Sequence, residues 1–310
     1  MIIGFAETAT AIAAAVASNI RNNCIFIHTS REKISSELCV ADFSEEHSHA
    51  SEQYLFSSNK KEIFKGVKHI VFVEDEITTG KTIINFVNVL KKLVETDCRF
   101  YAAAIVNGMD DTSLKNYRSL DISLFWLVKI ENSIEDMNCE LGISSNEGVK
   151  AFSRVRNVFR YDFDGNINPR LGCKTEDYML ACKLFAEEII GHLKELDIEA
   201  KTIDVIGTEE FMYPAIYLTD NLEKIGYIAL SHSTTRSPII PSDSIGYPLK
   251  NRCRLHSMYE YDRVTYLYNL YKCDAAIILT DAENGNEAAM NELVGMLDTP
   301  NVIIVSWRNR

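Results

Sequence analysis

The segment 71–82 carries residue types that could bind a cation and an anion side by side. An apolar run ends in the adjacent carboxylates Glu74 and Asp75, and such carboxylates can hold sugar hydroxyls or a hydrated Mg²⁺. The turn after them supplies hydroxyl groups and backbone donors at Thr78, Thr79, Gly80, Lys81 and Thr82. A turn that opens a helix directs its N–H groups and the positive end of the helix dipole at one anion. The segment therefore predicts a phosphate site beside an acidic site, and its spacing differs from that of a Walker A loop.

The elements around this segment alternate between predicted strands and helices. Apolar runs predict strands at 1–4, 24–28, 69–73, 100–106 and 123–130, and composition and periodicity predict helices at 9–19 and 82–94. This alternation favours a parallel sheet covered by helices, with ligands at the carboxyl ends of the strands. The polar residues 33–64 have weak periodicity and are predicted to form a long loop or lid.

The second half repeats the pattern of the first. Strands are predicted at 203–206, 227–231, 275–280 and 302–306, after an amphipathic helix at 176–196. The strand that ends at Gly4 corresponds to one that ends at Gly207, and Arg31 corresponds to Arg236 at nearly the same spacing. We interpret this as an internal duplication, although any two doubly wound sheets would share some strand spacing. The predicted fold is therefore α/β with two doubly wound parallel-sheet lobes, the second of which is a degenerate duplicate. The lobes are predicted at 1–135 and 196–310. A connector at 136–195, which contains the amphipathic helix, joins them.

Composition limits the classes of partner. The 310 residues include 32 basic and 44 acidic side chains, a formal charge of −12, which argues against a broad nucleic-acid surface because such a surface needs Lys and Arg to neutralise phosphates. The eight cysteines form no CxxC pair, so free thiols in a reducing, cytoplasmic compartment are expected rather than disulfides or zinc. No apolar run reaches transmembrane length, so no membrane contact is expected. The first strand begins almost at Met1, which favours missing upstream sequence or a shortened chain.

The segment 71–82 resembles the fingerprint of type I phosphoribosyltransferases, in which an apolar run precedes two acidic residues and a Thr-Gly-x-Thr turn. Further stretches look like predicted phosphoribosyltransferases encoded near tellurite-resistance genes, whose C-terminal part is named for a Thr-Arg-Ser-Pro motif. These stretches are 4–11, 45–50, 207–214 and 235–238. The resemblance spans nearly the whole chain and implies a phosphoribosyltransferase-like domain at 1–135 and a TRSP-type lobe at 196–310.

The resemblance implies an enzyme that transfers ribose 5-phosphate from phosphoribosyl pyrophosphate to a nitrogenous, nucleobase-like acceptor, with Mg²⁺ as cofactor and pyrophosphate as product. Glu74 and Asp75 would hold the metal and steady the ribose as it becomes cationic. The 5′-phosphate would bind at 78–82. Pyrophosphate would bind at a loop that opens a helix and contains Ala6, Glu7, Thr8 and Ala9.

The family also has a mobile catalytic loop after its second strand. Arg31 occupies the place of the basic residue that precedes this loop, and residues 34–64 would form the loop itself. A lysine or arginine is usual there, whereas this chain offers His47 and His49, which leaves the general acid open. The two histidines could instead form a metal pair or belong to a solvated loop.

The second lobe is predicted to hold the acceptor or a nucleotide at the ends of two strands. Its candidate residues are Gly207, Thr208, Glu209, Glu210, Thr235, Arg236 and Ser237. A structural pair of arginine and glutamate is the alternative interpretation. For the whole chain, the alternatives are a ribose-phosphate diphosphokinase-like enzyme and a regulatory protein that binds phosphoribosyl pyrophosphate or a nucleotide without turnover. A homodimer is left open.

Overall fold

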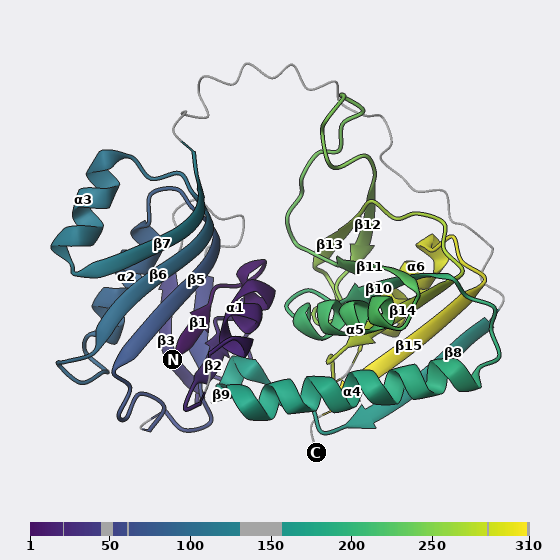
Figure 1. Cartoon of the computed structure of the whole chain (residues 1–310), viewed down its shortest axis with the longest axis horizontal. Coiled ribbons are helices and arrows are strands. Elements are labelled where there is room, and N and C mark those ends of the chain that lie inside the picture. The colour runs from purple at the N-terminus through teal and green to yellow at the C-terminus, as the bar shows by residue number, and fades with distance from the viewer. Residues whose placement is uncertain (21, 45–51, 61, 131–156, 284, 309–310) are drawn as a thin grey trace. The chain divides into compact units, whose positions relative to one another are not determined.

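The computed structural model describes residues 1–308 apart from 21, 45–51, 61, 131–156 and 284 (Figure 1). The chain divides into two compact units, Met1–Met137 with Ile167–Met179 and Asn138–Asn166 with Leu180–Arg310. Each unit is built around a parallel sheet. The predicted α/β class with two parallel-sheet lobes is therefore confirmed.

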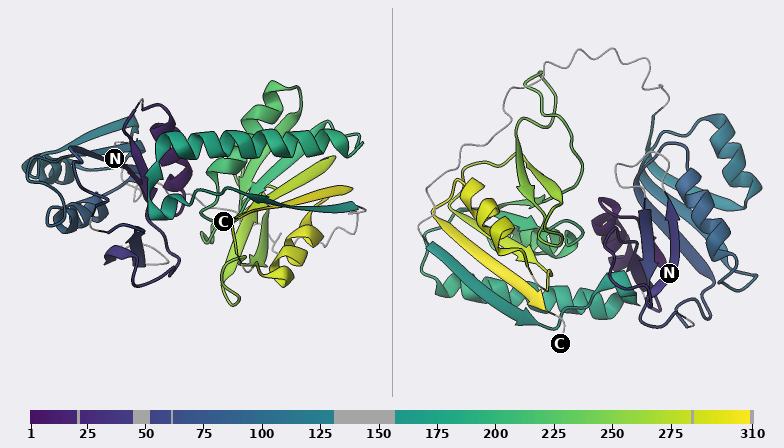
Figure 2. Two further views of the ribbon diagram at one scale, coloured as in Figure 1. Left: turned by 90° about the horizontal axis from the view of Figure 1, so that it is seen from below. Right: turned by 180° about the vertical axis from the view of Figure 1, so that it is seen from behind.

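The first unit contains a six-stranded sheet. Its strands lie in the order β7 (Ile122–Lys129), β6 (Arg99–Asn107), β5 (His69–Ile77), β1 (Ile2–Gly4), β2 (Ile25–His28) and β9 (Cys173–Lys174). The first five are parallel, and β9 pairs with β2 in the antiparallel sense. Helix α1 (Ala9–Ser18) covers one face, and α2 (Lys81–Leu90) and α3 (Asp111–Ser119) lie on the other (Figure 2). The carboxyl ends of the parallel strands therefore meet at one edge.

Helix α1 packs closely on β1 because small residues make the contact. A Cβ atom on Gly4 would lie 2.5 Å from the Cβ of Ala13 and 3.0 Å from the carbonyl oxygen of Ala9. Ala13 and its neighbour Ala14 are fully buried. The alanine-rich body of the helix is therefore core packing, and this packing sets the start of α1 beside the carboxyl end of β1.

The strand that carries the acidic residues is longer than predicted. Strand β5 continues through Ile77, with Glu74 paired to Ala104 of β6 and Glu76 to Val106. Strand β5 thus extends beyond the strand predicted at 69–73, because backbone pairing continues after the apolar run has ended.

Residues 34–64 also differ from the predicted loop. In their described part they form an antiparallel hairpin of β3 (Cys39–Ser44) and β4 (Glu52–Phe56). Ala41 and Leu55 lie in the core of the first unit. The hairpin was missed because a few buried residues anchor it among polar neighbours, which leaves little periodicity in the sequence.

The second unit contains a five-stranded parallel sheet. The order is β11 (Ile228–Ser233), β10 (Thr202–Gly207), β14 (Ala275–Thr280), β15 (Asn301–Arg308) and β8 (Asn157–Asp164). Helices α4 (Thr175–Glu195) and α5 (Tyr213–Lys224) lie on one face and α6 (Glu287–Met296) on the other (Figure 2). A hairpin of β12 (Arg252–His256) and β13 (Val264–Tyr268) follows β11 in the sequence.

The two sheets have the same strand order. The series β7-β6-β5-β1-β2 corresponds to β8-β15-β14-β10-β11, and a hairpin follows β2 as another follows β11. Ser30 bridges to Tyr54 in the first hairpin as Thr235 bridges to Tyr266 in the second. This is the arrangement that an internal duplication predicts. One strand departs from it, because β8 precedes the rest of its sheet in the sequence whereas β7 follows.

The segment predicted as a connector, 136–195, contributes to both sheets in its described part. Strand β8 pairs with β15 in the second sheet, and β9 pairs with β2 in the first, with the 3-10 helix η2 (Pro169–Leu171) between them. Strand β8 was missed because it is an edge strand in which charged residues alternate with aromatic ones.

None of the helices in the described part of the chain is long and apolar enough to cross a membrane. The cysteines within the same residues are free thiols.

Candidate functional site

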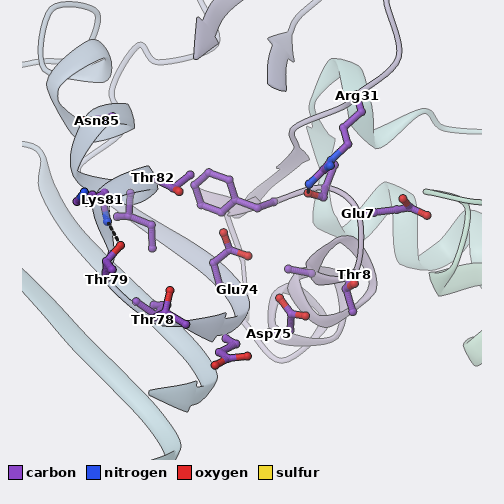
Figure 3. Close-up of a pocket in the computed structure, with 17 residues that line it drawn as sticks. Glu7, Thr8, Arg31, Glu74, Asp75, Thr78, Thr79, Lys81, Thr82 and Asn85 are labelled. Carbon is purple, nitrogen blue, oxygen red and sulfur yellow. Dashed lines mark hydrogen bonds between the residues drawn. The ribbon is translucent and has the colours of Figure 1, made fainter. Parts of the chain in front are cut away.

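A cavity of about 280 Å³ opens at the carboxyl edge of the first sheet. Its walls are the loop 5–9 between β1 and α1, the segment 74–83 from β5 into α2, and Arg31 after β2. Figure 3 shows Glu74 and Asp75 between the turn before α2 and the loop before α1. The segments converge because β1 lies between β5 and β2 in the sheet.

The acidic wall of the cavity comes from the last residues of β5. Glu74 and Asp75 are partly buried, Glu76 is exposed, and all three line the cavity. The pKa of Tyr117 is raised by burial and, to a smaller extent, by the negative charge of Glu74. Tyr117 also contacts the turn before α2, through the Gly80 carbonyl.

The turn before α2 has a shape that only glycine fits. Gly80 has φ +70°, in the left-handed region, and a Cβ there would lie 2.3 Å from Cε2 of Tyr117 and 2.5 Å from Cε of Met109. The Tyr117 hydroxyl donates to the Gly80 carbonyl at 3.1 Å. The N–H of Lys81 donates to Oγ1 of Thr79 at 3.4 Å (Figure 3). These contacts present the N-terminus of α2 to the cavity, an arrangement suited to a phosphate.

The loop before α1 is held by side chains from neighbouring strands. The N–H of Ala6 donates to Oγ1 of Thr29 at 2.8 Å. The Ala6 carbonyl accepts from Nε2 of Gln53 at 3.1 Å and from Nη2 of Arg31 at 3.3 Å. Thr29 and Gln53 are both fully buried and hydrogen bond to each other. Sequence reasoning missed Thr29 and Gln53; the one available signal was a polar residue at an inward position of β4.

The structure brings together the residues predicted for the first site, so far as it describes them. Those that line the cavity are Ala6, Glu7, Thr8, Ala9, Arg31, Glu74, Asp75, Thr78, Thr79, Gly80, Lys81 and Thr82. His47 and His49 lie outside the described residues, so a catalytic role for them stays a prediction.

The donor set of the cavity fits a divalent cation that is shared with a substrate. Within the described residues, no group of three or more His, Cys, Asp or Glu side chains could hold a metal ion. Glu74 and Asp75 are adjacent hard oxygen donors. Mg²⁺ is commonly bound by one or two carboxylates together with water and substrate phosphates. A pair of carboxylates is therefore sufficient when the substrate supplies the remaining ligands.

The residues predicted for a second site centre on a buried ion-pair network. Glu209 is 1% exposed, and its carboxylate contacts Nε of Arg236 at 3.4 Å and Nη2 of Arg263 at 2.7 Å. It also accepts from Oγ of Ser257 at 2.5 Å. This geometry favours the structural interpretation of Glu209 and Arg236. Arg263 was missed because its contact spans 54 residues.

The other candidates of the second lobe surround this network. Thr208 and Glu210 are buried, and Gly207 lets the segment before α5 approach the end of β10, because a Cβ there would lie 2.5 Å from the Phe211 carbonyl oxygen. Thr235 is partly buried and pairs with β13, and Ser237 is exposed. These positions do not show whether the residues bind a ligand, so a ligand role for them stays a prediction.

Two family models match the chain, one in each half. Residues 1–135 match the family model described as "Phosphoribosyl transferase" (PRTase_2). Residues 168–297 match the model described as "TRSP domain C terminus to PRTase_2". The first domain is thus of the phosphoribosyltransferase class. The chain belongs to the family in which a TRSP domain follows a PRTase_2 domain, as the sequence predicted.

The chain is also similar to solved structures. Adenine phosphoribosyl transferase from Trypanosoma brucei, in complex with AMP, pyrophosphate and ribose-5-phosphate, has 17% identity and a TM-score of 0.35, over 48% of this chain and 64% of that chain. Adenine phosphoribosyltransferase from Leishmania donovani has 11% identity and a TM-score of 0.32, over 46% and 62%. The match spans less than two thirds of either structure, and at these TM-scores it adds nothing to the fold described above. No curated protein matches the sequence.

Proposed function

We propose that the protein is a phosphoribosyltransferase that uses phosphoribosyl pyrophosphate and Mg²⁺ to transfer ribose 5-phosphate to a nitrogenous, nucleobase-like acceptor. The observation that carries this proposal is the convergence of three kinds of group on one cavity. The turn at 78–82 suits a 5′-phosphate, the pair Glu74 and Asp75 suits ribose hydroxyls or a cation, and the loop 6–9 suits pyrophosphate. The family match of residues 1–135 supports the same reaction class.

The chain's own residues would bind and orient the reactants. The N–H groups at the start of α2 and the hydroxyls of Thr78, Thr79 and Thr82 hold the 5′-phosphate. The carboxylates of Glu74 and Asp75 stabilise the positive charge that develops on the ribose as the bond to pyrophosphate breaks and the acceptor nitrogen bonds to the same carbon.

The leaving side of the reaction involves Arg31 and the loop 6–9. Arg31 reaches the Ala6 carbonyl, so its guanidinium lies beside the loop where pyrophosphate would depart, and a guanidinium fork suits phosphate oxygens. Mg²⁺, when held by Glu74 and Asp75 together with the substrate, would neutralise charge on the leaving pyrophosphate.

Calorimetric titration of the full chain with phosphoribosyl pyrophosphate, with and without Mg²⁺, tests the binding site. Glu74→Gln combined with Asp75→Asn should weaken Mg²⁺-dependent binding by more than about 100-fold, because two charge-assisted contacts are each worth about 1.5–3 kcal/mol. The fold should remain intact, since both side chains line the cavity and are only partly buried. A matched control, Glu62→Gln with Asp220→Asn, removes the same charge from exposed positions. Undiminished binding in the first variant would show that the site assignment is wrong.

Transfer itself is tested by incubating the protein with labelled phosphoribosyl pyrophosphate and a metabolite extract, followed by mass spectrometry. A labelled ribonucleotide that forms with loss of pyrophosphate would support the reaction and identify the acceptor. Tight binding with no product from any acceptor would instead favour the regulatory alternative.

A further inference from the structure

A buried chain of hydrogen bonds links the hairpin β3–β4 to the loop before α1. Gln53 on β4 donates from Nε2 to the Ala6 carbonyl at 3.1 Å, and its Oε1 accepts from the Thr29 hydroxyl. The same hydroxyl oxygen accepts from the Ala6 N–H at 2.8 Å. Both polar groups of the Ala6 backbone are thus held by side chains, one from the residue that follows β2 and one from β4.

The polar side chain at position 53 is not explained by packing. Gln53 is 0% exposed, and Leu55, which shares its face of β4, belongs to the apolar core. An apolar residue would suit this position, because burial of an amide is unfavourable unless its hydrogen bonds are made. The hydrogen bonds of Gln53 offset that cost, and they also fix the orientation of the Ala6–Glu7 peptide. Since a peptide unit is planar, a held Ala6 carbonyl fixes the plane of the Ala6–Glu7 peptide and the direction of the Glu7 N–H.

The second lobe holds the corresponding loop residue partly in the same way and partly through a different side chain, since the Glu209 carbonyl accepts from Oγ of Ser233 at 3.2 Å. Its counterpart of Ala6 is Glu209, whose N–H donates to Oγ1 of Thr234 at 2.9 Å, as that of Ala6 does to Thr29. The threonine anchor of the loop N–H is therefore common to both lobes and belongs to the shared scaffold.

The link from the hairpin is different in the two lobes. Gln53 precedes the bridging residue Tyr54, and the residue that precedes the bridging Tyr266 is Thr265. Thr265 is also fully buried, but its hydroxyl donates to the Leu255 carbonyl at 3.4 Å, within its own hairpin. The bond from a hairpin to the loop carbonyl is thus made by Gln53, in the lobe that also contains the Thr-Gly-x-Thr turn.

We propose that Gln53 is a positioning residue for pyrophosphate. It holds the Ala6–Glu7 peptide so that the loop before α1 presents its N–H groups to the pyrophosphate part of phosphoribosyl pyrophosphate. Arg31 reaches the same carbonyl at 3.3 Å, so Gln53 also constrains where that guanidinium lies. Gln53 is fully buried and acts through Ala6. This role rests on the function proposed above.

The test uses the full chain and two probes that occupy different parts of the cavity, inorganic pyrophosphate with Mg²⁺ and ribose 5-phosphate. Gln53→Met keeps the length of the side chain and removes its amide. Gln53→Thr reproduces the residue of the second hairpin, and Thr265→Val is the matched control in that hairpin. Both Gln53 variants should bind pyrophosphate about tenfold more weakly, which corresponds to one or two hydrogen bonds. Their affinity for ribose 5-phosphate should change by less than about twofold, and Thr265→Val should change neither.

Three results would overturn the role. Unchanged pyrophosphate affinity in both Gln53 variants would exclude it, and equal weakening for both probes would indicate a general loss of structure instead. If the parent protein binds neither probe, the proposed function fails and the role of Gln53 fails with it. Thermal melting followed by circular dichroism identifies a variant that does not fold. If Gln53→Met is such a variant, Gln53→Thr decides the question.

Discussion

Replacement of Gly80 by alanine should destabilise the first unit and weaken phosphate binding together. Gly80 has φ +70°, where a residue with a Cβ is strained by about 1 kcal/mol or more. The new Cβ would lie 2.3 Å from Cε2 of Tyr117 and 2.5 Å from Cε of Met109, and both side chains are buried. Carbon atoms normally pack at about 3.5–4.0 Å, so the ring must shift by about 1 Å, and overpacking of this kind costs about 1–3 kcal/mol. We expect Gly80→Ala to lower the free energy of unfolding by about 2–4 kcal/mol.

Gly66→Ala is the matched control in the same unit. Gly66 has φ +71°, but no atom lies within 4 Å of the Cβ that alanine would add, so only the backbone strain of about 1 kcal/mol applies. Urea unfolding followed by circular dichroism compares the two variants, and their difference measures the steric clash. Titration with ribose 5-phosphate should show weaker binding for Gly80→Ala alone. Equal losses of stability, or full ribose 5-phosphate affinity in Gly80→Ala, would refute the idea that close packing sets the shape of this turn.

The second unit offers two further predictions. Burial raises the pKa of Asp204 above its unfolded value of about 3.9, so the stability from this group is present below about pH 4 and is lost as the pH rises through the folded pKa. Asp204→Asn should therefore raise the melting temperature at pH 8 and change it little near pH 4, and an equal gain at every pH would contradict this. Arg236→Lys should lower the free energy of unfolding by about 1–3 kcal/mol, because lysine lacks the Nε–H group that contacts buried Glu209, and leave ligand affinity unchanged. Denaturant unfolding measures the stability of Arg236→Lys, and titration with phosphoribosyl pyrophosphate measures its ligand affinity. Weaker binding of phosphoribosyl pyrophosphate at unchanged stability would favour a ligand role for Arg236 instead.

Local sequence patterns predicted the strands at the centres of the two sheets, because each of these strands is an apolar run buried on both faces. The segment 275–280 is fully buried, and β10 is nearly so. Prediction failed for β8 and the hairpin β3–β4, in which exposed polar residues alternate with a few buried ones. Whether such a segment pairs with a sheet depends on neighbours that are distant in the sequence. For β8 that neighbour is β15, whose residues lie 144 positions further along the chain, as in the contact of Asn157 with Asn301.

The residues of the first site also divide into those that a local pattern predicts and those that depend on contacts distant in the sequence. The residues at 74–82 and 6–9 were predictable, because the loops that follow parallel strands meet at the carboxyl edge whatever the details of packing. Gln53 was not predictable, since its contact with Ala6 exists only because the hairpin folds back over β2, with Ser30 bridging to Tyr54. Residues that bind a ligand tend to follow motif spacing, whereas residues that position them follow tertiary contacts.

A comparison of the two lobes shows which contacts around the first loop belong to the scaffold that they share. Each lobe anchors its first loop with a threonine hydroxyl, through Thr29 or Thr234, and each joins its hairpin to the strand edge by the same backbone bridge. The side chain on the loop differs: Ala6 in the first lobe corresponds to Glu209 in the second, where the carboxylate binds two arginines of its own chain. A carboxylate buried there satisfies the guanidinium groups internally, and breaking such a pair is costly. The threonine anchor and the backbone bridge are therefore common to both lobes, while the side chains around the loop differ, as expected if the first lobe binds phosphates and the second uses the same position for stability.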